Sequence, residues 1–263
     1  MQVTTEYAEV AIDLRNYEHG TGMNIEIPVR KGILQATLHD VFISGRPFNI
    51  DSSNDRIFLI DTLLVEYVII IEHGCWTMTE ICERITEAIQ GAGLLSVIFQ
   101  YNTTTSMVEV AGSNEIIYID TPTTTGLTSR ILMKMLGVPD SFATLTLAAV
   151  IPPQPIPGAH KAGLYTGLDL MYILFEPLSN QAQYHDTHER DVVAKLPIRF
   201  TEDITVWNVT NGTPYTYSFF GGVKYRGSGK LQLIKKNIAY NIRTHLEWQE
   251  GSWAILSWIL QVK

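Results

Sequence analysis

Residues 67–93 read YVIIIEHGCWTMTEICERITEAIQGAG, and this stretch decides the fold class of the region around it. The run Tyr67–Glu72 is typical of a buried strand. Thr77 and Glu80 then form a capping-box pattern, in which each side chain can bind a free N–H at a helix start. Apolar residues recur at helical spacing after it, namely Met78, Ile81, Cys82, Ile85, Ala88 and Ile89. The glycines that follow end the helix. Because the stretch carries no catalytic pattern, we expect it to pack a core.

The residues after this helix predict a compact α+β unit. Three short alternating runs with turns between them indicate a three-strand meander: Leu95–Tyr101, Met107–Ala111 and Glu115–Ile119. A second, shorter helix is predicted at Ser129–Leu136, because Gly137 and Pro139 supply the usual ending. We therefore expect residues 48–145 to form a core of their own from two helices and about five strands.

The sequence on both sides of this unit predicts a β domain. Before it, Asn24–Val29 and Ile33–Ser44 alternate with period two, as in an antiparallel sheet with one wet face. After it come further runs of strand character: Leu168–Phe175, Val192–Phe200, Ile204–Val209, Tyr215–Phe219, Gly229–Ile234, Ile238–Trp248 and Trp253–Val262. Strands at this spacing suggest a sandwich or jelly roll. Residues 152–163 are proline-rich and predict a stiff linker at the domain boundary.

The composition narrows the classes of function. With 46% hydrophobic and 17% charged residues among 263, the chain has few charges for a free monomer, which favours surface buried in an assembly. A net charge of −8 argues against a general nucleic-acid binder, and no apolar run is long enough for a membrane span. Cys75 and Cys82 are too few for a disulfide framework and predict a reducing compartment.

Two features could carry chemistry. The segment His185–Asp191 reads HDTHERD, and His185 with His188 could bind the metal of a jelly-roll enzyme. These two histidines lie three residues apart in a predicted loop, so their side chains would not both point inward from one strand. A solvated loop is therefore the better interpretation. Aromatic residues of the C-terminal half could form a glycan-binding platform or fill a core or subunit contact; they are Trp207, Tyr215, Tyr217, Phe219, Phe220, Trp248, Trp253 and Trp258. We predict no catalytic residue, no cofactor and no metal site.

The order of these segments resembles that of penton and minor capsid proteins of virophages, polinton-like elements and large double-stranded DNA viruses. The elements that carry the resemblance are Gly74 with Trp76, Thr79–Ile89, Tyr101–Thr105, Leu136–Pro139, Leu170–Phe175, Leu196–Ile198 and the closing strands of Ile238–Val262. The resemblance covers most of the chain from about Asn24 onward.

The resemblance implies a mainly β protein, a jelly-roll β-sandwich with an inserted or adjoining α+β subdomain that carries two helices. Residues 1–46 would form an arm and the first strands, residues 47–150 the α+β subdomain, and residues 151–263 the rest of the jelly roll. It implies a structural virion protein of the icosahedral capsid, a penton or other minor capsid protein. Its partners would be itself, as a pentamer, and neighbouring major and minor capsid proteins. A fibre-like or lectin-like attachment protein is the first alternative, and a metal-dependent jelly-roll enzyme the second.

Overall fold

The computed structural model separates into two compact units, Met1–Pro47 with Asp169–Lys263, and Phe48–Leu168. The residues it describes are 3–14, 22–27, 32–61, 63–94, 96–112, 115–119, 124–138, 144–148, 153–156, 158–164, 169–175, 192–201, 203–208, 216–218, 228–237 and 241–262. We call the first unit the sandwich and the second the α+β unit, and describe each by itself.

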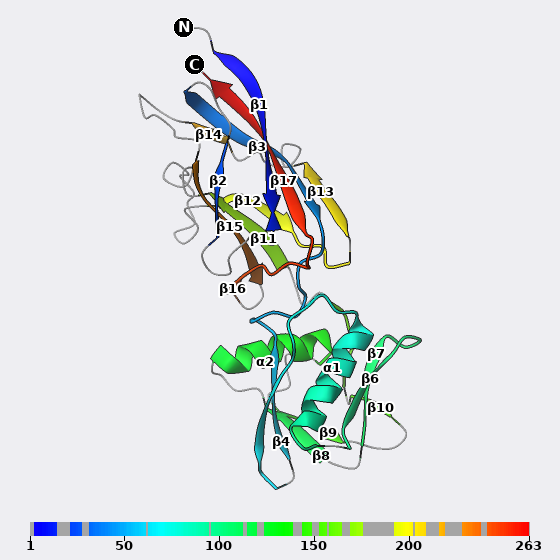
Figure 1. The fold of residues 1–263 in the computed structure, drawn as a ribbon. Coiled ribbons are helices and arrows are strands. Elements are labelled where there is room, and N and C mark those ends of the chain that lie inside the picture. Colours follow the sequence, from blue (N-terminus) through cyan, green and yellow to red (C-terminus); the bar gives the residue numbers. More distant parts are fainter. Residues whose placement is uncertain are drawn as a thin grey trace. The chain divides into compact units, whose positions relative to one another are not determined.

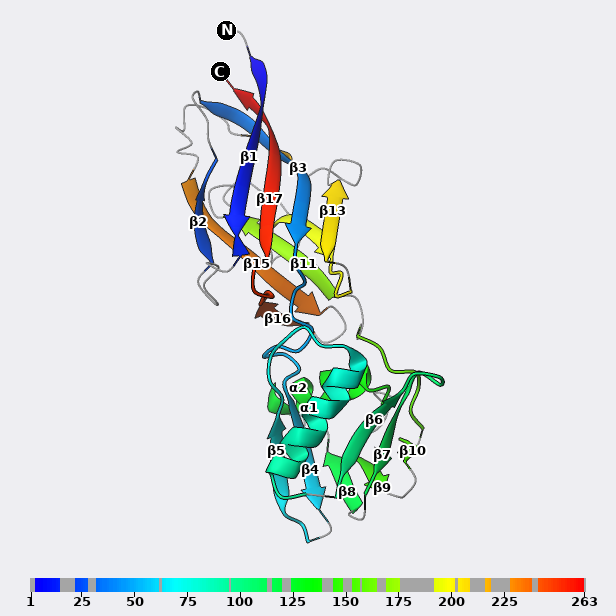
Figure 2. The same cartoon turned by 45° about the vertical axis from the view of Figure 1, so that its right-hand side comes forward.

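The first sheet of the sandwich joins the two ends of the chain (Figures 1 and 2). Its strand order is β1 (Thr4–Asp13), β17 (Trp253–Val262), β3 (Ile33–Ser44) and β13 (Ile204–Asn208), and β14 (Thr216–Ser218) also pairs with β3. All these pairs are antiparallel, and Thr4 lies opposite Val262 while Asp13 lies opposite Trp253. We call this the β3 sheet.

The second sheet of the sandwich has the order β12 (Val192–Pro197), β11 (Asp169–Phe175), β15 (Ser228–Asn237) and β16 (Ile242–His245), and β2 (Met23–Glu26) also pairs with β15. We call it the β11 sheet. The inward side chains of both sheets share one core. Its fully buried members include Leu38, Val41, Ile173, Phe175, Leu231, Trp258 and Leu260. The predicted jelly-roll β-sandwich is confirmed.

The α+β unit contains two sheets and both helices (Figure 2). One sheet has the order β5 (Glu66–Ile70), β4 (Arg56–Asp61), β8 (Glu115–Ile119) and β9 (Thr144–Ala148). The other has the order β10 (Gln154–Pro155), β7 (Met107–Ala111) and β6 (Ile98–Asn102). The helices are α1 (Met78–Gly91) and α2 (Thr124–Met135). A single core joins both helices with β4, β5, β6 and β7.

Helix α1 begins as its sequence predicts. The backbone N–H of Thr77 donates to Oε2 of Glu80 at 2.7 Å, and the N–H of Glu80 donates to Oγ1 of Thr77 at 3.3 Å, which completes the capping box. The buried face of the helix consists of Met78, Ile81, Cys82, Ile85 and Ile89. Thr86 connects the helix to β6, because its Oγ1 accepts a hydrogen bond from the N–H of Phe99 at 2.8 Å. The same hydroxyl donates to the carbonyl of Cys82, one turn earlier in α1, at 2.9 Å. Burial raises the pKa of the Cys82 thiol to about 12, so this thiol is inert.

Two sequence-based expectations for the strands and helices of this unit were wrong. The three-strand meander does not form: β6 pairs with β7, but β8 pairs with β4 and β9 in the other sheet. Gly112 separates β7 from β8 at φ +144°, a conformation that side chains rarely adopt. Helix α2 starts at Thr124, five residues earlier than predicted.

The predicted proline-rich linker packs as part of the α+β unit. Gln154 and Pro155 pair with β7, and Ile156, which is 1% exposed, donates its N–H to the carbonyl of Val108 at 3.2 Å. Proline lacks an N–H but tolerates the edge of a sheet, which is where β10 lies. Apolar Ile156 between the prolines is what anchors the segment.

Candidate interaction surface

The segment around His185 and His188 was expected to be a solvated loop, and the aromatic residues of the C-terminal half to fill a core, a subunit contact or a glycan-binding platform. His185 and His188 lie outside the described residues. Among the aromatic residues whose side chains are described, Trp258 is fully buried and packs against Phe175 with ring centroids 6.0 Å apart, whereas Trp253 is 40% exposed. Trp248 is half-buried and lines a cavity. These side chains serve separate places in the sandwich and do not form one platform.

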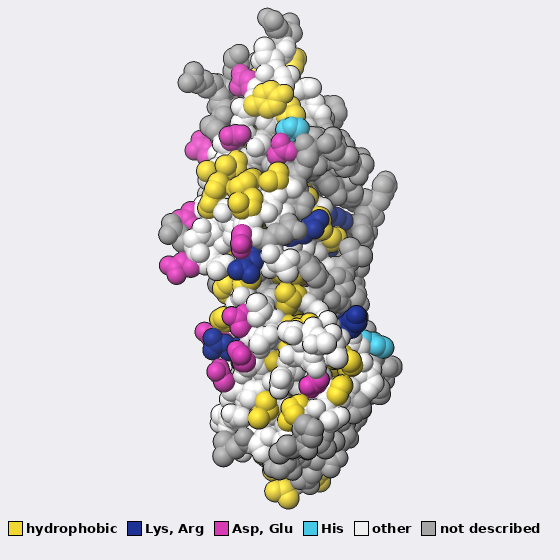
Figure 3. Space-filling model, turned by 90° about the vertical axis from the view of Figure 1, so that its right-hand side faces the viewer, with side chains coloured by type: hydrophobic (Ala, Val, Ile, Leu, Met, Phe, Trp, Pro, Cys, Tyr) yellow, Lys and Arg dark blue, Asp and Glu magenta, His cyan; other side chains and the backbone are white. Residues whose placement is uncertain are grey.

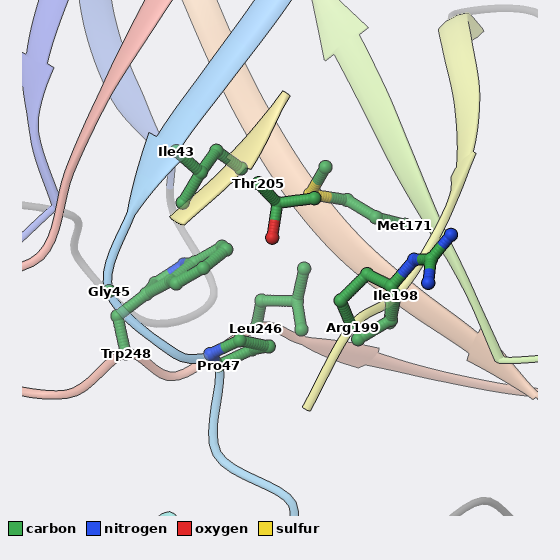
Figure 4. A pocket seen from close by; sticks show the side chains of 9 residues that line it. All are labelled: Ile43, Gly45, Pro47, Met171, Ile198, Arg199, Thr205, Leu246 and Trp248. Carbon is green, nitrogen blue, oxygen red and sulfur yellow. The ribbon is translucent and has the colours of Figure 1, made fainter. Parts of the chain in front are cut away.

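A small cavity lies at one end of the sandwich (Figure 4). Its lining is mainly apolar and comprises Ile43, Gly45, Pro47, Met171, Ile198, Arg199, Thr205, Leu246 and Trp248. Its volume of about 10 Å³ is far below the roughly 300–1,000 Å³ of small-molecule sites. Figure 4 shows the Arg199 guanidinium directed away from the other lining side chains. We assign this cavity to imperfect packing and not to ligand binding.

Sites for a metal and spans for a membrane are absent from the part of the chain that the structure describes. No group of three His, Cys, Asp or Glu side chains there is placed to hold a metal ion. Within the same residues, no helix is both long enough and apolar enough to cross a membrane.

Apolar side chains cross the outer face of the β3 sheet in a row. Ala11 lies opposite Ile255, Ile255 opposite Phe42, and Phe42 opposite Val206, so the row spans all four principal strands. Side chains alternate between the two faces of a sheet, and the neighbours of these residues along each strand fill the core. Val206 is 61% exposed, while Phe42 and Ile255 are half-buried.

A second row widens this apolar surface. Trp253 and Ile204 both lie opposite Ser44, on its two sides. The ring of Trp253 stacks at a tilt on the ring of Phe42, with centroids 5.1 Å apart, and Ile204 is 59% exposed. We name this surface the β3-sheet patch: Phe42, Ile204, Val206, Trp253 and Ile255. Figure 3 shows hydrophobic side chains gathered on this face of the sandwich with acidic side chains nearby.

Polar and charged residues border the patch. Glu9 and Asp40 lie on either side of Ser257 in the adjacent cross-strand row. Beside Ile204, Nε of Arg46 lies 2.9 Å from Oδ1 of Asp203, an ion pair whose Asp side chain is 80% exposed. An apolar centre with a polar rim is the usual anatomy of a protein–protein contact.

The outer face of the β11 sheet differs in character. Tyr172 lies between two lysines on neighbouring strands, Lys195 and Lys236. Their ammonium groups lie 5.1 and 5.4 Å from the centroid of the Tyr172 ring, within the range of cation–π attraction. Lys230, on the same face of β15, adds a third cation. The sandwich therefore presents one apolar face with acidic neighbours and one face rich in lysine.

Sequence reasoning missed the patch although part of its signal was present. The strand WAILSWILQV is apolar on both faces. Because its alternate residues are buried in the core, Trp253 and Ile255 must lie on the outer face of the sheet. Nothing in the sequence placed Phe42 and Val206 beside them. That neighbourhood follows from the pairing of β3 with both β17 and β13.

Comparison with known proteins finds similarity in the fold. No protein-family model matches the sequence, and no curated protein matches it. The crystal structure of the selenomethionine-labelled mavirus penton protein matches over 100% of both chains, with a TM-score of 0.55 and 10% sequence identity. A chain of the 3.5 Å cryo-EM structure of the Sputnik virophage matches over 98% of both chains, with a TM-score of 0.44 and 9% identity. The first match shows that this chain shares the fold of the mavirus penton protein, which is the fold that the resemblance predicted.

Proposed function

We propose that this protein is a structural capsid protein, most specifically a penton protein that forms a five-fold ring in an icosahedral shell. The observation that carries the proposal is the match to the mavirus penton protein over the whole of both chains. In this proposal the chain works in the virion capsid through buried contacts and catalyses no reaction. Its partners are other copies of itself and neighbouring major and minor capsid proteins, with no direct contact to nucleic acid.

The two outer faces of the sandwich support this proposal. A cyclic ring needs a heterologous contact, in which a surface of one subunit meets a different surface of the next. The β3-sheet patch offers apolar area next to Glu9 and Asp40, and the β11 sheet offers Lys195 and Lys230. We infer that the patch of one subunit packs on the outer face of the β11 sheet of its neighbour. Opposite charges at the rim would then set the register of the contact.

Native mass spectrometry of the purified chain tests the proposal. We expect a pentamer, and we expect Val206→Asp together with Ile204→Asp to dissociate it, because two charges would be buried in the contact. The matched control is Leu63→Asp together with Leu64→Asp, which places the same two charges at apolar side chains that are each 80% exposed in the α+β unit. This control should leave the pentamer intact.

Other assembly states would contradict the proposal. A trimer would favour a fibre-like arrangement, and a monomer with stoichiometric metal would favour the enzyme alternative. Assembly in a reducing compartment of the infected cell stays a prediction; it is compatible with Cys75 and Cys82, which are not joined in a disulfide.

A further inference from the structure

Strand β5 forms one end of its sheet. Among the described residues its strand partner is β4, and the strand order ends at β5. Two backbone hydrogen bonds establish which residues of β5 face β4: Asp61 donates its N–H to the carbonyl of Val65 at 3.1 Å, and Ile71 donates its N–H to the carbonyl of Asp55 at 2.7 Å. In an antiparallel pair the residues that bond to the partner alternate with residues that do not. The backbone groups of Glu66, Val68 and Ile70 therefore point to the open edge.

The side chains at the same positions are apolar and exposed. Val68 is 53% exposed and Ile70 is 61% exposed, although both lie in regular strand. Edge strands usually carry a protective lysine, proline or bulge. Strand β5 reads EYVII, and its register with β4 runs without a shift from Ile70 to Glu66. This edge thus combines a row of backbone hydrogen-bonding groups with alternate apolar side chains, the two elements of strand-addition sites.

The hairpin that carries β5 is held rigid by Asp61. Its Oδ1 accepts the N–H of Leu63 at 2.8 Å and of Val65 at 2.9 Å, and its Oδ2 accepts the hydroxyl of Tyr67 at 3.0 Å. The backbone hydrogen bond from Val65 and the bond from Tyr67 hold the pKa of Asp61 below its ordinary value, so the carboxylate stays charged at neutral pH. An edge that is already ordered avoids part of the entropic cost of binding.

Acidic side chains flank the open edge and indicate the partner. Glu66 begins the strand and is exposed, and Glu72, two residues after Ile70, keeps 66% of its side chain exposed although Nη1 of Arg84 lies 3.4 Å from its Oε2. Antiparallel pairing of β5 with a second copy of itself about Val68 would place Glu66 of one copy diagonally beside Glu72 of the other, twice. Like charges at such positions are destabilising. A strand with basic residues at its ends has the complementary charge.

We propose that the open edge of β5 is a strand-addition site for an extended segment of another protein, with apolar side chains at alternate positions and basic residues at its ends. The segment would bind the outward backbone groups of Glu66, Val68 and Ile70 and cover the side chains of Val68 and Ile70. This proposal stands on the geometry of the α+β unit and is independent of the capsid role proposed above.

The test uses the full chain and, as the probe, a fluorescein-labelled, amidated peptide of sequence KTVTVTK, whose Val and Lys side chains share one face of a strand. Fluorescence anisotropy should show saturable binding, and binding of the acid-flanked peptide ETVTVTE should be weaker. In the protein, Val68→Pro removes one outward N–H and leaves the ladder to β4 intact, because proline is tolerated where the N–H faces solvent. We expect it to weaken peptide binding about tenfold or more.

The matched control is Val68→Thr, which keeps the N–H and the β-propensity and should change affinity less than about threefold. Thermal unfolding of both variants checks that the α+β unit is intact, and native mass spectrometry checks that assembly of the sandwich is unchanged. Anisotropy therefore reports peptide binding and native mass spectrometry reports the capsid contact, so failure of one proposal can be distinguished from failure of the other.

Three results would overturn the proposal. Equal affinity of the Pro and Thr variants would show that backbone groups at Val68 take no part. Concentration-dependent dimerisation that Val68→Pro abolishes would identify a second copy as the occupant. Binding to neutral phosphatidylcholine vesicles that depends on Leu63 and Leu64, without peptide binding, would identify the 80% exposed tip as a membrane contact.

Discussion

The sandwich and the α+β unit bury cores of similar character but assemble them from different parts of the chain. In the sandwich, β1 pairs with β17 along its whole length, so residues 4–13 depend on residues 253–262. In the α+β unit, α1 follows β5 within eight residues and packs against β6 shortly after it. Local contacts lose less chain entropy when they form than contacts between distant segments. This comparison explains why helix α1 and its cap could be read from local sequence, whereas the pairing of strands could not, in the sandwich or in the α+β unit.

The two units also expose apolar residues in different ways. The β3-sheet patch lies on the face of a sheet, where area and rim charge decide the partner. Strand β5 exposes its edge, where backbone hydrogen bonds decide the partner. We therefore expect the sandwich to bind folded surfaces and the α+β unit to bind extended segments. The predictions below test whether the two units are as independent as this contrast implies.

The largest effect is expected from Ile85→Asp on helix α1. Ile85 is fully buried in the core of the α+β unit, and an unpaired charge there should cost about 4 kcal/mol or more. Residues 48–145 should unfold cooperatively while the sandwich keeps its strands. Limited proteolysis followed by mass spectrometry measures which residues become cleavable, and we expect the new cleavage sites within residues 48–145. The exposed Thr79→Asp on the same helix is the control and should leave both units protected. A soluble variant with an intact α+β core would mean that the buried face of α1 is misplaced.

Trp258→Ala should destabilise the sandwich and leave the α+β unit intact, with a slightly smaller loss of free energy of unfolding. Trp258 is 0% exposed in the core of the sandwich, and truncating it should cost about 3–5 kcal/mol through lost burial and a cavity. We expect the thermal transition of the sandwich to fall while that of the α+β unit is unchanged. Trp253→Ala, the same change at a 40% exposed side chain of the same strand, should cost much less. Equal shifts in both units would show that they unfold as one.

The smallest effect is expected from acid and from Asp55→Asn. Burial alone would raise the pKa of Asp55, but hydrogen bonds from Arg56 at 2.9 Å and His73 at 3.1 Å outweigh it and hold this pKa below its ordinary value. The carboxylate therefore adds stability that is fully present above about pH 4, the unfolded pKa, and is lost as the pH falls through the lowered folded value.

Urea unfolding at pH 7 and pH 3 measures this contribution in the α+β unit. Asp55→Asn should lower the free energy of unfolding by about 2 kcal/mol at pH 7, because the charged carboxylate that accepts the hydrogen bonds of Arg56 and His73 becomes a neutral amide. The loss should be smaller at pH 3. The change in stability of the sandwich between pH 7 and pH 3 should be the same in the wild type and in Asp55→Asn. If the α+β unit also lost the same stability between these pH values in both proteins, the charge of Asp55 would not stabilise the fold.

The sequence by itself determined the elements whose signals are local. The capping box at Thr77, the buried stripe of α1 and the alternation in β3 are set by neighbouring side chains, and each appears in the structure. Only the tertiary structure decided which strands meet. It moved β8 out of the predicted meander, drew Ile156 into a core and placed Phe42, Ile255 and Val206 in one row. Alternation tells which residues share a face, but the partner across that face is chosen by the burial of distant segments, and no local pattern encodes that choice.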